Sequence, residues 1–254
     1  MSDDRLTIGS SIERLVATFS SSDALTMNRN DRYSFLVLAC ADLARCVRKE
    51  KTGLYPIALA QIVAWFASLA EELFRTDAGL LLTNAMGDKF PAMGCGYCGH
   101  FPCICEEAHR AEHVVSVPST SQYLWSINRW QEHLEQLYGP NNSTGGIPRA
   151  LNRLFEEVAE VGLILHSADG FNDNLKDVRR KYAQEFTDVL AWTFACASLL
   201  KISLEDSVIS LYGSECPVCR SFPCNCRHFE KKPSGECTHR FMSAQDIYDA
   251  IRAK

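Results

Sequence analysis

The sequence lacks the features that mark several large classes of protein. No apolar run reaches the roughly 18 residues needed to span a bilayer. The two longest candidates, 57–70 and 189–200, are interrupted by polar residues, so we expect buried core helices. The N-terminus, MSDDRLT, carries acids where a secretory leader would be basic, and we expect no such leader. Low-complexity segments and a convincing alternating strand pattern are also missing.

An excess of basic residues is missing as well. The 26 lysines and arginines are outnumbered by 31 aspartates and glutamates, which gives a net charge of −5. This balance offers no electrostatic footprint for duplex nucleic acid or an anionic membrane surface. With 46% hydrophobic and 22% charged residues, the chain has the composition of a soluble globular protein, which we expect in the cytoplasm.

Cysteine, in contrast, is abundant. Eight of the twelve cysteines form two clusters with the same C-x2-C-x4-C-x-C spacing: Cys95, Cys98, Cys103 and Cys105, then Cys216, Cys219, Cys224 and Cys226. Each residue of the second cluster lies 121 positions after its counterpart, as Cys216 does after Cys95, and an inner Phe-Pro pair is kept in both. This agreement indicates an internal duplication.

The duplication predicts two related domains and a tail. We expect a first repeat at 1–106 and a second at 122–227, joined by a linker at 113–121. Leu15 and Phe19 match Leu134 and Tyr138, and an Ala-Trp pair recurs in the two apolar helices. The remainder, 228–254, is expected to carry one last helix at 244–252.

Apolar residues in the second repeat recur with helical spacing. The pattern predicts helices at 124–137, 151–165 and 175–200, a loop at 139–148, and a short fourth helix that begins after Ser203 and ends near Gly213. The expected fold is all-α: a tandem pair of four-helix units packed on each other, each followed by a four-cysteine knuckle.

Four carboxylates of the second repeat are candidate metal ligands. Glu157 and Glu160 are three residues apart on one predicted helix, and Glu185 and Asp188 are three apart on the next, so each pair shares a helix face. Four carboxylates facing one another would repel unless a cation neutralised them. An all-oxygen ligand set favours Mg²⁺ or Mn²⁺, and no Glu-x-x-His motif supports a di-iron site.

The pattern EE-x-x-E, a spacer of 161–184, then E-x-x-D resembles the signature of the all-α nucleoside triphosphate pyrophosphohydrolases, the MazG-like superfamily. The resemblance covers about 125–213. It implies a Mg²⁺-dependent hydrolase that cuts a nucleoside triphosphate or deoxynucleoside triphosphate between its α and β phosphorus atoms, releasing the monophosphate and pyrophosphate.

The resemblance also implies roles for single residues. Glu157, Glu160, Glu185 and Asp188 are the implied magnesium ligands, and Glu156 either acts on the attacking water or faces solvent. Basic side chains before Glu185 are candidates to hold the phosphates, or they form a solvated basic face: Lys176, Arg179, Arg180 and Lys181. Trp130 is a candidate to contact the base, with core packing as the alternative.

The first repeat departs from this pattern. Alignment places Ala41, Asp42 and Arg45 opposite the E-E-x-x-E acids, and Ala58 and Gln61 opposite Glu185 and Asp188. One carboxylate of five is too few for Mg²⁺, so the first repeat is predicted to be a degenerate copy. Because enzymes of this family commonly work as dimers, the chain resembles a fused pseudo-dimer, and a further homo-oligomer stays open.

Each cysteine cluster offers four thiolates, enough for one tetrahedral Zn²⁺ in a closed structural site, with an iron–sulfur cluster as the rival. Cys40, Cys46 and Cys196 lie in apolar stretches and are predicted to be core residues, whereas Cys237 and His239 form a chance pair or an extra ligand pair. The competing functional hypothesis is a non-catalytic, zinc-containing nucleotide sensor or interaction protein.

Overall fold

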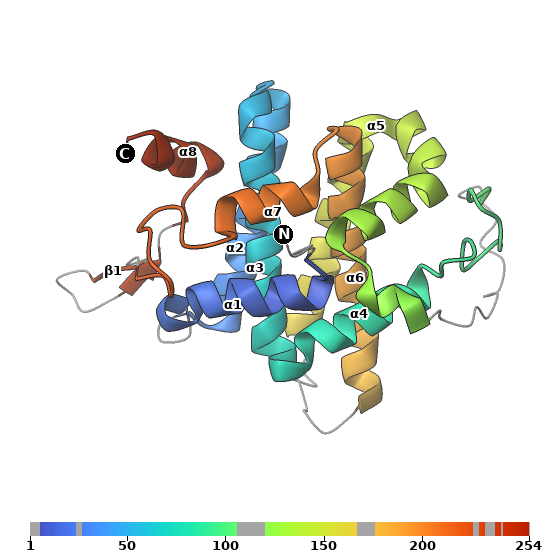
Figure 1. Ribbon diagram of the computed structural model, residues 1–254, viewed down its shortest axis with the longest axis horizontal. Coiled ribbons are helices and arrows are strands. Elements are labelled where there is room, and N and C mark those ends of the chain that lie inside the picture. Colours follow the sequence, from blue (N-terminus) through green and yellow to red (C-terminus); the bar gives the residue numbers. More distant parts are fainter. Residues whose placement is uncertain are drawn as a thin grey trace, which may run out of the picture. The chain divides into compact units, whose positions relative to one another are not determined.

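The structure is a computed structural model of the chain. It describes residues 6–23, 27–105, 120–166, 176–225, 229–231, 237–239 and 241–253. Within these ranges the fold is helical apart from one short hairpin, β1 (Phe229–Lys231) paired antiparallel with β2 (Cys237–His239) (Figure 1). The α-helices are α1 (Ile8–Asp23), α2 (Arg29–Arg48), α3 (Tyr55–Phe74), α4 (Ala78–Lys89), α5 (Ile127–His166), α6 (Lys176–Leu199), α7 (Leu204–Tyr212) and α8 (Ala244–Arg252).

The helix predictions for the second repeat are confirmed except at the expected loop. Helices α6, α7 and α8 have nearly the predicted bounds, but helix α5 runs through 139–148 and leaves helical geometry only at Gly146 (φ 62°, ψ −168°). Glycine adopts this positive φ without a Cβ clash. The break between the two predicted helices is confirmed, but it is a kink at Gly146 and not a loop that spans 139–148. In the same stretch, Asn141 Nδ2 donates to the Cys103 carbonyl (3.3 Å).

The chain divides into two compact units that do not coincide with the predicted repeats. The first compact unit comprises 1–10 and 77–205, and the second comprises 11–76 and 206–254. Helix α4 and the first cysteine cluster therefore belong with α5 and α6 of the second repeat. Helix α7, the second cluster and the tail belong with α1, α2 and α3 of the first repeat. The last helix and the knuckle of each predicted repeat thus pack with helices of the other repeat.

Each compact unit is built on one pair of long helices. In the first, α5 packs against α6, and α4 packs on α6; Trp130, Phe186 and Phe194 are among the largest fully buried side chains. In the second, α2 packs against α3, and α8 packs on α3, around Phe66 and Phe74. The two acidic helices of the predicted site are thus the central pair of the first compact unit.

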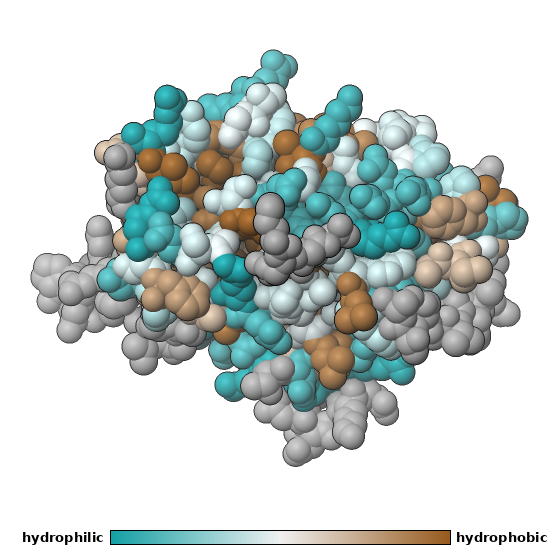
Figure 2. Space-filling view, viewed as in Figure 1, coloured by the Kyte–Doolittle hydropathy of each residue, from teal (hydrophilic) through white to brown (hydrophobic). Residues whose placement is uncertain are grey.

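Helix α3 is the most apolar element. The stretch Thr52–Phe74 is long and apolar enough to cross a membrane, and the bent pair Tyr182–Leu199 with Leu204–Tyr212 passes the same test as a broken span. Of the apolar window in Thr52–Phe74, 72% is buried inside the protein. A buried core helix has the same length and composition, so this evidence for a span is weak. Hydrophilic and hydrophobic side chains are interspersed on the face shown in Figure 2.

Candidate metal centres and the acidic site

The first cysteine cluster has the geometry of a single-ion site. All four Sγ atoms of Cys95, Cys98, Cys103 and Cys105 lie within 4.8 Å of one another. The Cys95–Cys105 and Cys98–Cys103 Sγ distances are 3.8 and 4.0 Å. A tetrahedron with Zn–S bonds of about 2.3 Å has S···S edges of about 3.8 Å. The cluster could therefore hold zinc, and the described cysteines form no disulfide.

Backbone amides support this ligand set. The amides of Tyr97 and Cys105 donate to the Sγ atoms of Cys95 and Cys103, at 3.4 Å each. Hydrogen bonds of this kind to the ligand atoms fix the orientation of the ligands. In a multi-iron cluster the thiolates bind different irons and are spread apart, whereas here they surround one point. The arrangement favours zinc over an iron–sulfur cluster.

The second cluster repeats this geometry as far as it is described. Cys216, Cys219 and Cys224 have Sγ atoms within 4.8 Å of one another, and the Cys219–Cys224 distance is 3.7 Å. The fourth predicted ligand, Cys226, lies outside the described residues. This cluster could hold zinc as well.

Turn geometry is also the same in both knuckles. The amide of Cys95 donates to the His100 carbonyl (3.0 Å), as Cys216 does to Ser221 (3.2 Å). Gly99 has a positive φ of 71°, and Arg220, its counterpart 121 residues later, has 59°. An arginine in the left-handed region is uncommon, so the fold of the knuckle imposes this conformation.

The remaining cysteine predictions are settled in part. Cys40, Cys46 and Cys196 are buried, with exposed fractions of 0%, 2% and 0%, which confirms them as core residues. The side chains of Cys237 and His239 lie outside the described part of the chain.

The acidic site lies along the α5–α6 pair of the first compact unit. Glu157 and Glu160 come from α5, and Glu185 and Asp188 come from α6. Burial, then the nearby charges of Asp188 and Glu160, raise the pKa of Glu157 to about 7. Burial is also the main cause that raises the pKa of Asp188, with Glu185 and Glu160 adding to it. These effects place Glu157, Glu160 and Asp188 within electrostatic reach of one another, and Glu185 within reach of Asp188.

A fifth residue, which the sequence analysis missed, completes this site. Lys89, the last residue of α4, forms an ion pair between its Nζ and Asp188 Oδ2. Its charge lowers the pKa values of both Glu157 and Asp188, opposing the effect of burial. No motif marks Lys89 in the sequence, since it lies 99 residues before Asp188 and precedes the first knuckle.

The carboxylates are more widely spaced than the thiolates. Among the described residues, groups of three or more potential ligand atoms within 4.8 Å of one another occur at the two cysteine clusters and not at the acidic site. Without a bound cation, repulsion between carboxylates keeps such groups apart. The ammonium of Lys89 takes the place beside Asp188 that a cation would use.

The other predicted site residues have varied positions. Glu156 is exposed and pairs with Arg153 (2.7 Å), which favours the solvent-facing alternative. Trp130 has an exposed fraction of 0% and packs against Trp125 (4.8 Å between centroids), which favours the core alternative over base contact.

The predicted phosphate-binding side chains face acids of the α4 region where they are described. Arg179 pairs with Asp77 (3.4 Å), and Arg180 pairs with Asp88. The side chains of Lys176 and Lys181 lie outside the described residues. Arg179 and Arg180 thus pair with acids next to and on α4. The described ion pairs of these two arginines do not include any of the four carboxylates.

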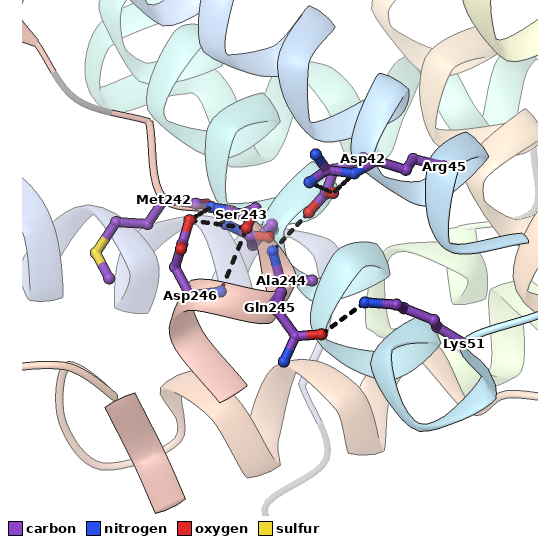
Figure 3. A network of polar contacts seen from close by, with 9 residues as sticks. Asp42, Arg45, Lys51, Met242, Ser243, Ala244, Gln245 and Asp246 are labelled. Atoms are coloured by element: carbon purple, nitrogen blue, oxygen red, sulfur yellow. Dashed lines mark hydrogen bonds and ion pairs between the residues drawn. The ribbon is translucent and has the colours of Figure 1, made fainter. Parts of the chain in front are cut away.

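The degenerate counterpart of the acidic site is occupied by the C-terminal tail. Asp42, which aligns with Glu157, is 3% exposed and accepts a hydrogen bond from the amide of Ala244, at the start of α8 (2.5 Å). It also pairs with Arg45 (Figure 3). Gln61, which aligns with Asp188, donates to the Met242 carbonyl (2.6 Å). A helix N-terminus and an arginine therefore neutralise the one carboxylate that this half retains.

Comparison with known proteins found no matching family model, no matching curated protein and no matching solved structure.

Proposed function

We propose that the chain is a Mg²⁺-dependent nucleotide pyrophosphohydrolase of the MazG-like type, with one active site on α5 and α6. The substrate is a nucleoside or deoxynucleoside triphosphate, and the products are the monophosphate and pyrophosphate. The observation that carries the proposal is the proximity of Glu157, Glu160 and Glu185 to Asp188, together with a raised pKa of about 7 at Glu157.

Electrostatics supports a divalent cation at this site. Four carboxylates in a half-buried environment are unfavourable unless protons or cations neutralise them. Lys89 supplies a single positive charge, and the raised pKa values of Glu157 and Asp188 indicate that this is not enough. Oxygen ligands from two carboxylate pairs suit Mg²⁺, which keeps positions open for water and substrate phosphates.

The cation would supply the chemistry of phosphoryl transfer: it neutralises phosphate charge and lowers the pKa of a bound water. The four carboxylates of this chain would hold it. Lys89 and the arginines at 179 and 180 provide positive charge on the α4 side, where the phosphate tail of a substrate can be neutralised.

The exchanged helices support the pseudo-dimer interpretation. In the first compact unit, α4 from the degenerate repeat packs on α6 of the repeat that carries the four acids. The degenerate repeat thus supplies structure beside the acidic site, as a second subunit does in a dimeric enzyme. The zinc knuckles are structural in this proposal, because a closed set of four thiolates leaves no position for water.

The test is to incubate the purified full chain with MgCl₂ and each of the eight common ribonucleoside and deoxyribonucleoside triphosphates, and to measure pyrophosphate and monophosphate. Glu160→Gln and Asp188→Asn are expected to lower turnover at least about 100-fold, since each removes a metal ligand. Glu135→Gln, an exposed change on the same helix, is the matched control and should keep wild-type turnover. Wild-type release no higher than that of the Glu160→Gln, Asp188→Asn double variant would sink the enzyme proposal.

One observation favours a second candidate, a nucleotide sensor without turnover. Among the described residues, the four carboxylates do not form a compact ligand group, which suits binding of a metal–nucleotide complex without turnover better than catalysis. A sensor binds nucleotide with Mg²⁺ but releases no pyrophosphate. Equilibrium dialysis with Mg²⁺ and radiolabelled nucleotide, run beside the turnover assay, separates the two candidates.

A further inference from the structure

We propose that Lys89 is a built-in counter-cation of the acidic site, which Mg²⁺ displaces from Asp188 and which then binds the phosphates of the substrate. The first step, displacement by a divalent cation, requires only the acidic site. The second step rests on the proposed function.

The contacts of Lys89 place its ammonium on an oxygen of Asp188, one of the four proposed metal ligands. Its Nζ pairs with Asp188 Oδ2 and lies 3.5 Å from the Gln184 carbonyl oxygen, on the preceding turn of α6. The Lys89 and Asp188 side chains are only 25% and 17% exposed, so the pair is largely shielded from water. Among the described ion pairs, this is the one that reaches any of the four carboxylates.

A divalent cation and this ammonium compete for the same oxygen. Mg²⁺ carries twice the charge of an ammonium. It also binds several carboxylate oxygens at once in an octahedral shell, which a single ammonium cannot do. Once the cation neutralises Asp188, the ion pair loses its attraction and the two positive charges repel. Lysine has a flexible four-carbon stem, so its ammonium can move away without a change in the backbone of α4.

The displaced ammonium remains beside the site because α4 is anchored on α6. Asp77, just before α4, pairs with Arg179, and Asp88, in the last turn of α4, pairs with Arg180. Lysine binds phosphate as a mobile point charge, and the phosphate tail brings new negative charge to the metal. When the metal binds, Lys89 therefore leaves the Asp188 carboxylate, and when the substrate binds, its ammonium pairs with a phosphate oxygen.

This role gives a reason for the degenerate repeat to contribute α4 to the first compact unit. The four acids come from the second repeat, but the lysine that neutralises them comes from the first. The degenerate half is then a source of a substrate-binding residue as well as a packing partner.

The experiment measures the affinity of the full-length protein for Mn²⁺ alone, by electron paramagnetic resonance of the free ion, with no nucleotide present. Lys89→Gln removes the competing charge and is expected to tighten Mn²⁺ binding roughly fivefold to tenfold, the effect of about 1 kcal/mol of ion pairing. Lys89→Arg keeps the charge and should bind Mn²⁺ like wild type. Lys201→Gln, an exposed change after α6, is the matched control and should also leave the affinity unchanged.

A Lys89→Gln affinity for Mn²⁺ equal to or weaker than that of the wild type overturns the inference, because a merely structural lysine has no reason to oppose the metal. In the turnover assay, the same variant is expected to raise KM for the nucleotide at saturating Mg²⁺, with Lys89→Arg restoring part of the loss. If Lys89→Gln binds Mn²⁺ more tightly but the wild type shows no turnover, the displacement step is supported and the proposed function is contradicted. Failure of the inference and failure of the proposed function are therefore distinguishable.

Discussion

The backbone amide of Cys224 donates a hydrogen bond to the carbonyl of Thr18 (2.6 Å), and Cys103 does the same to Leu137 (2.8 Å). The two bonds are equivalent by sequence: Cys224 is the counterpart of Cys103, and Thr18 aligns with Leu137. Each knuckle thus lies on the first long helix of the other repeat. Aromatic contacts repeat as well, with edge-to-face pairs at Tyr138–Phe90 (6.1 Å) and Phe19–Tyr212 (5.4 Å).

This reciprocal exchange predicts that neither repeat folds alone. A chain cut between residues 106 and 119 leaves α4 without α6, and α7 and the second knuckle without α1. We expect each isolated half to lack cooperative thermal unfolding by circular dichroism, and the two halves expressed together to regain it. The uncut protein is the control. A half that unfolds cooperatively by itself near the wild-type temperature contradicts the exchange.

The sulfur geometry predicts two zinc ions per chain. Cys98→Ser and Cys219→Ser each remove one ligand of one knuckle and are expected to lower the zinc content to about one per chain, with a loss of stability of several kcal/mol. Cys196→Ala, which removes a core thiol, should keep both ions. Elemental analysis of purified protein gives the count. Retention of two ions by either ligand variant contradicts the assignment, and iron in place of zinc favours the rival cluster.

The knuckles were the most predictable part of the molecule. The predicted ligands of each knuckle lie within eleven residues of one another, and the seven that the structure describes converge as the spacing predicts. The acidic pairs were predictable for a similar reason, because i and i+3 share a helix face whatever the tertiary fold. Helix α8 has the predicted bounds, and Ser243 and Asp246 form the capping box that explains where it begins.

Contacts between distant segments were not predictable. The pairing of Lys89 with Asp188 depends on α4 packing on α6, and the sequence places α4 in the other repeat. The expected break at 139–148 is present as a kink at Gly146, but the hydrogen bond from Asn141 to the first knuckle was not predictable. The hydrogen bond from the Ala244 amide to the Asp42 carboxylate joins positions 202 residues apart. In each case the contact partner is remote in the sequence, so no local pattern reveals it.

The raised pKa of Glu157 predicts an unusual pH dependence of stability for the metal-free protein. The folded state holds the Glu157 proton up to about pH 7, whereas the ordinary value is 4.5. As pH rises from 5 to 7, the unfolded state loses this proton first, so the free energy of unfolding falls in this window and levels off above it. Glu157 is half-exposed, and solvent screening limits the effect to a Tm change of about 2–4 °C.

Thermal unfolding in EDTA, which removes magnesium, compares the wild type with Glu157→Gln across this pH range. The variant should lack the contribution of Glu157, so the Tm difference between the two proteins should shrink as pH falls from 7 to 5. Glu135→Gln is the control for a change of charge on α5. A difference that is constant with pH contradicts the raised pKa. Chelation also strips zinc, so the zinc content is measured in the same samples.

The tail contacts predict that Asp42 is essential for docking of α8. The Asp42 carboxylate is 3% exposed and accepts from the Ala244 amide, where the positive end of the α8 dipole adds to the attraction. Asp42→Asn keeps the shape and removes the charge, so we expect a loss of about 1–2 kcal/mol in the free energy of unfolding and faster trypsin cleavage after Arg252. Urea titration and timed proteolysis measure the two effects.

Asp249 on α8 provides the matched control, because its side chain is bonded by the neighbouring Gln245 and not by another helix. Asp249→Asn should leave both the stability and the cleavage rate near wild type.

Met242 and Ile247 of the tail also line one cavity with Cys216 and Val218, so zinc removal from the second knuckle is expected to speed the same cleavage. The reason is that the knuckle loses its fixed shape and the tail loses one wall of its docking surface. If Asp42→Asn and Cys219→Ser leave tail cleavage unchanged while Asp249→Asn accelerates it, α8 is held by its exposed side and not by Asp42.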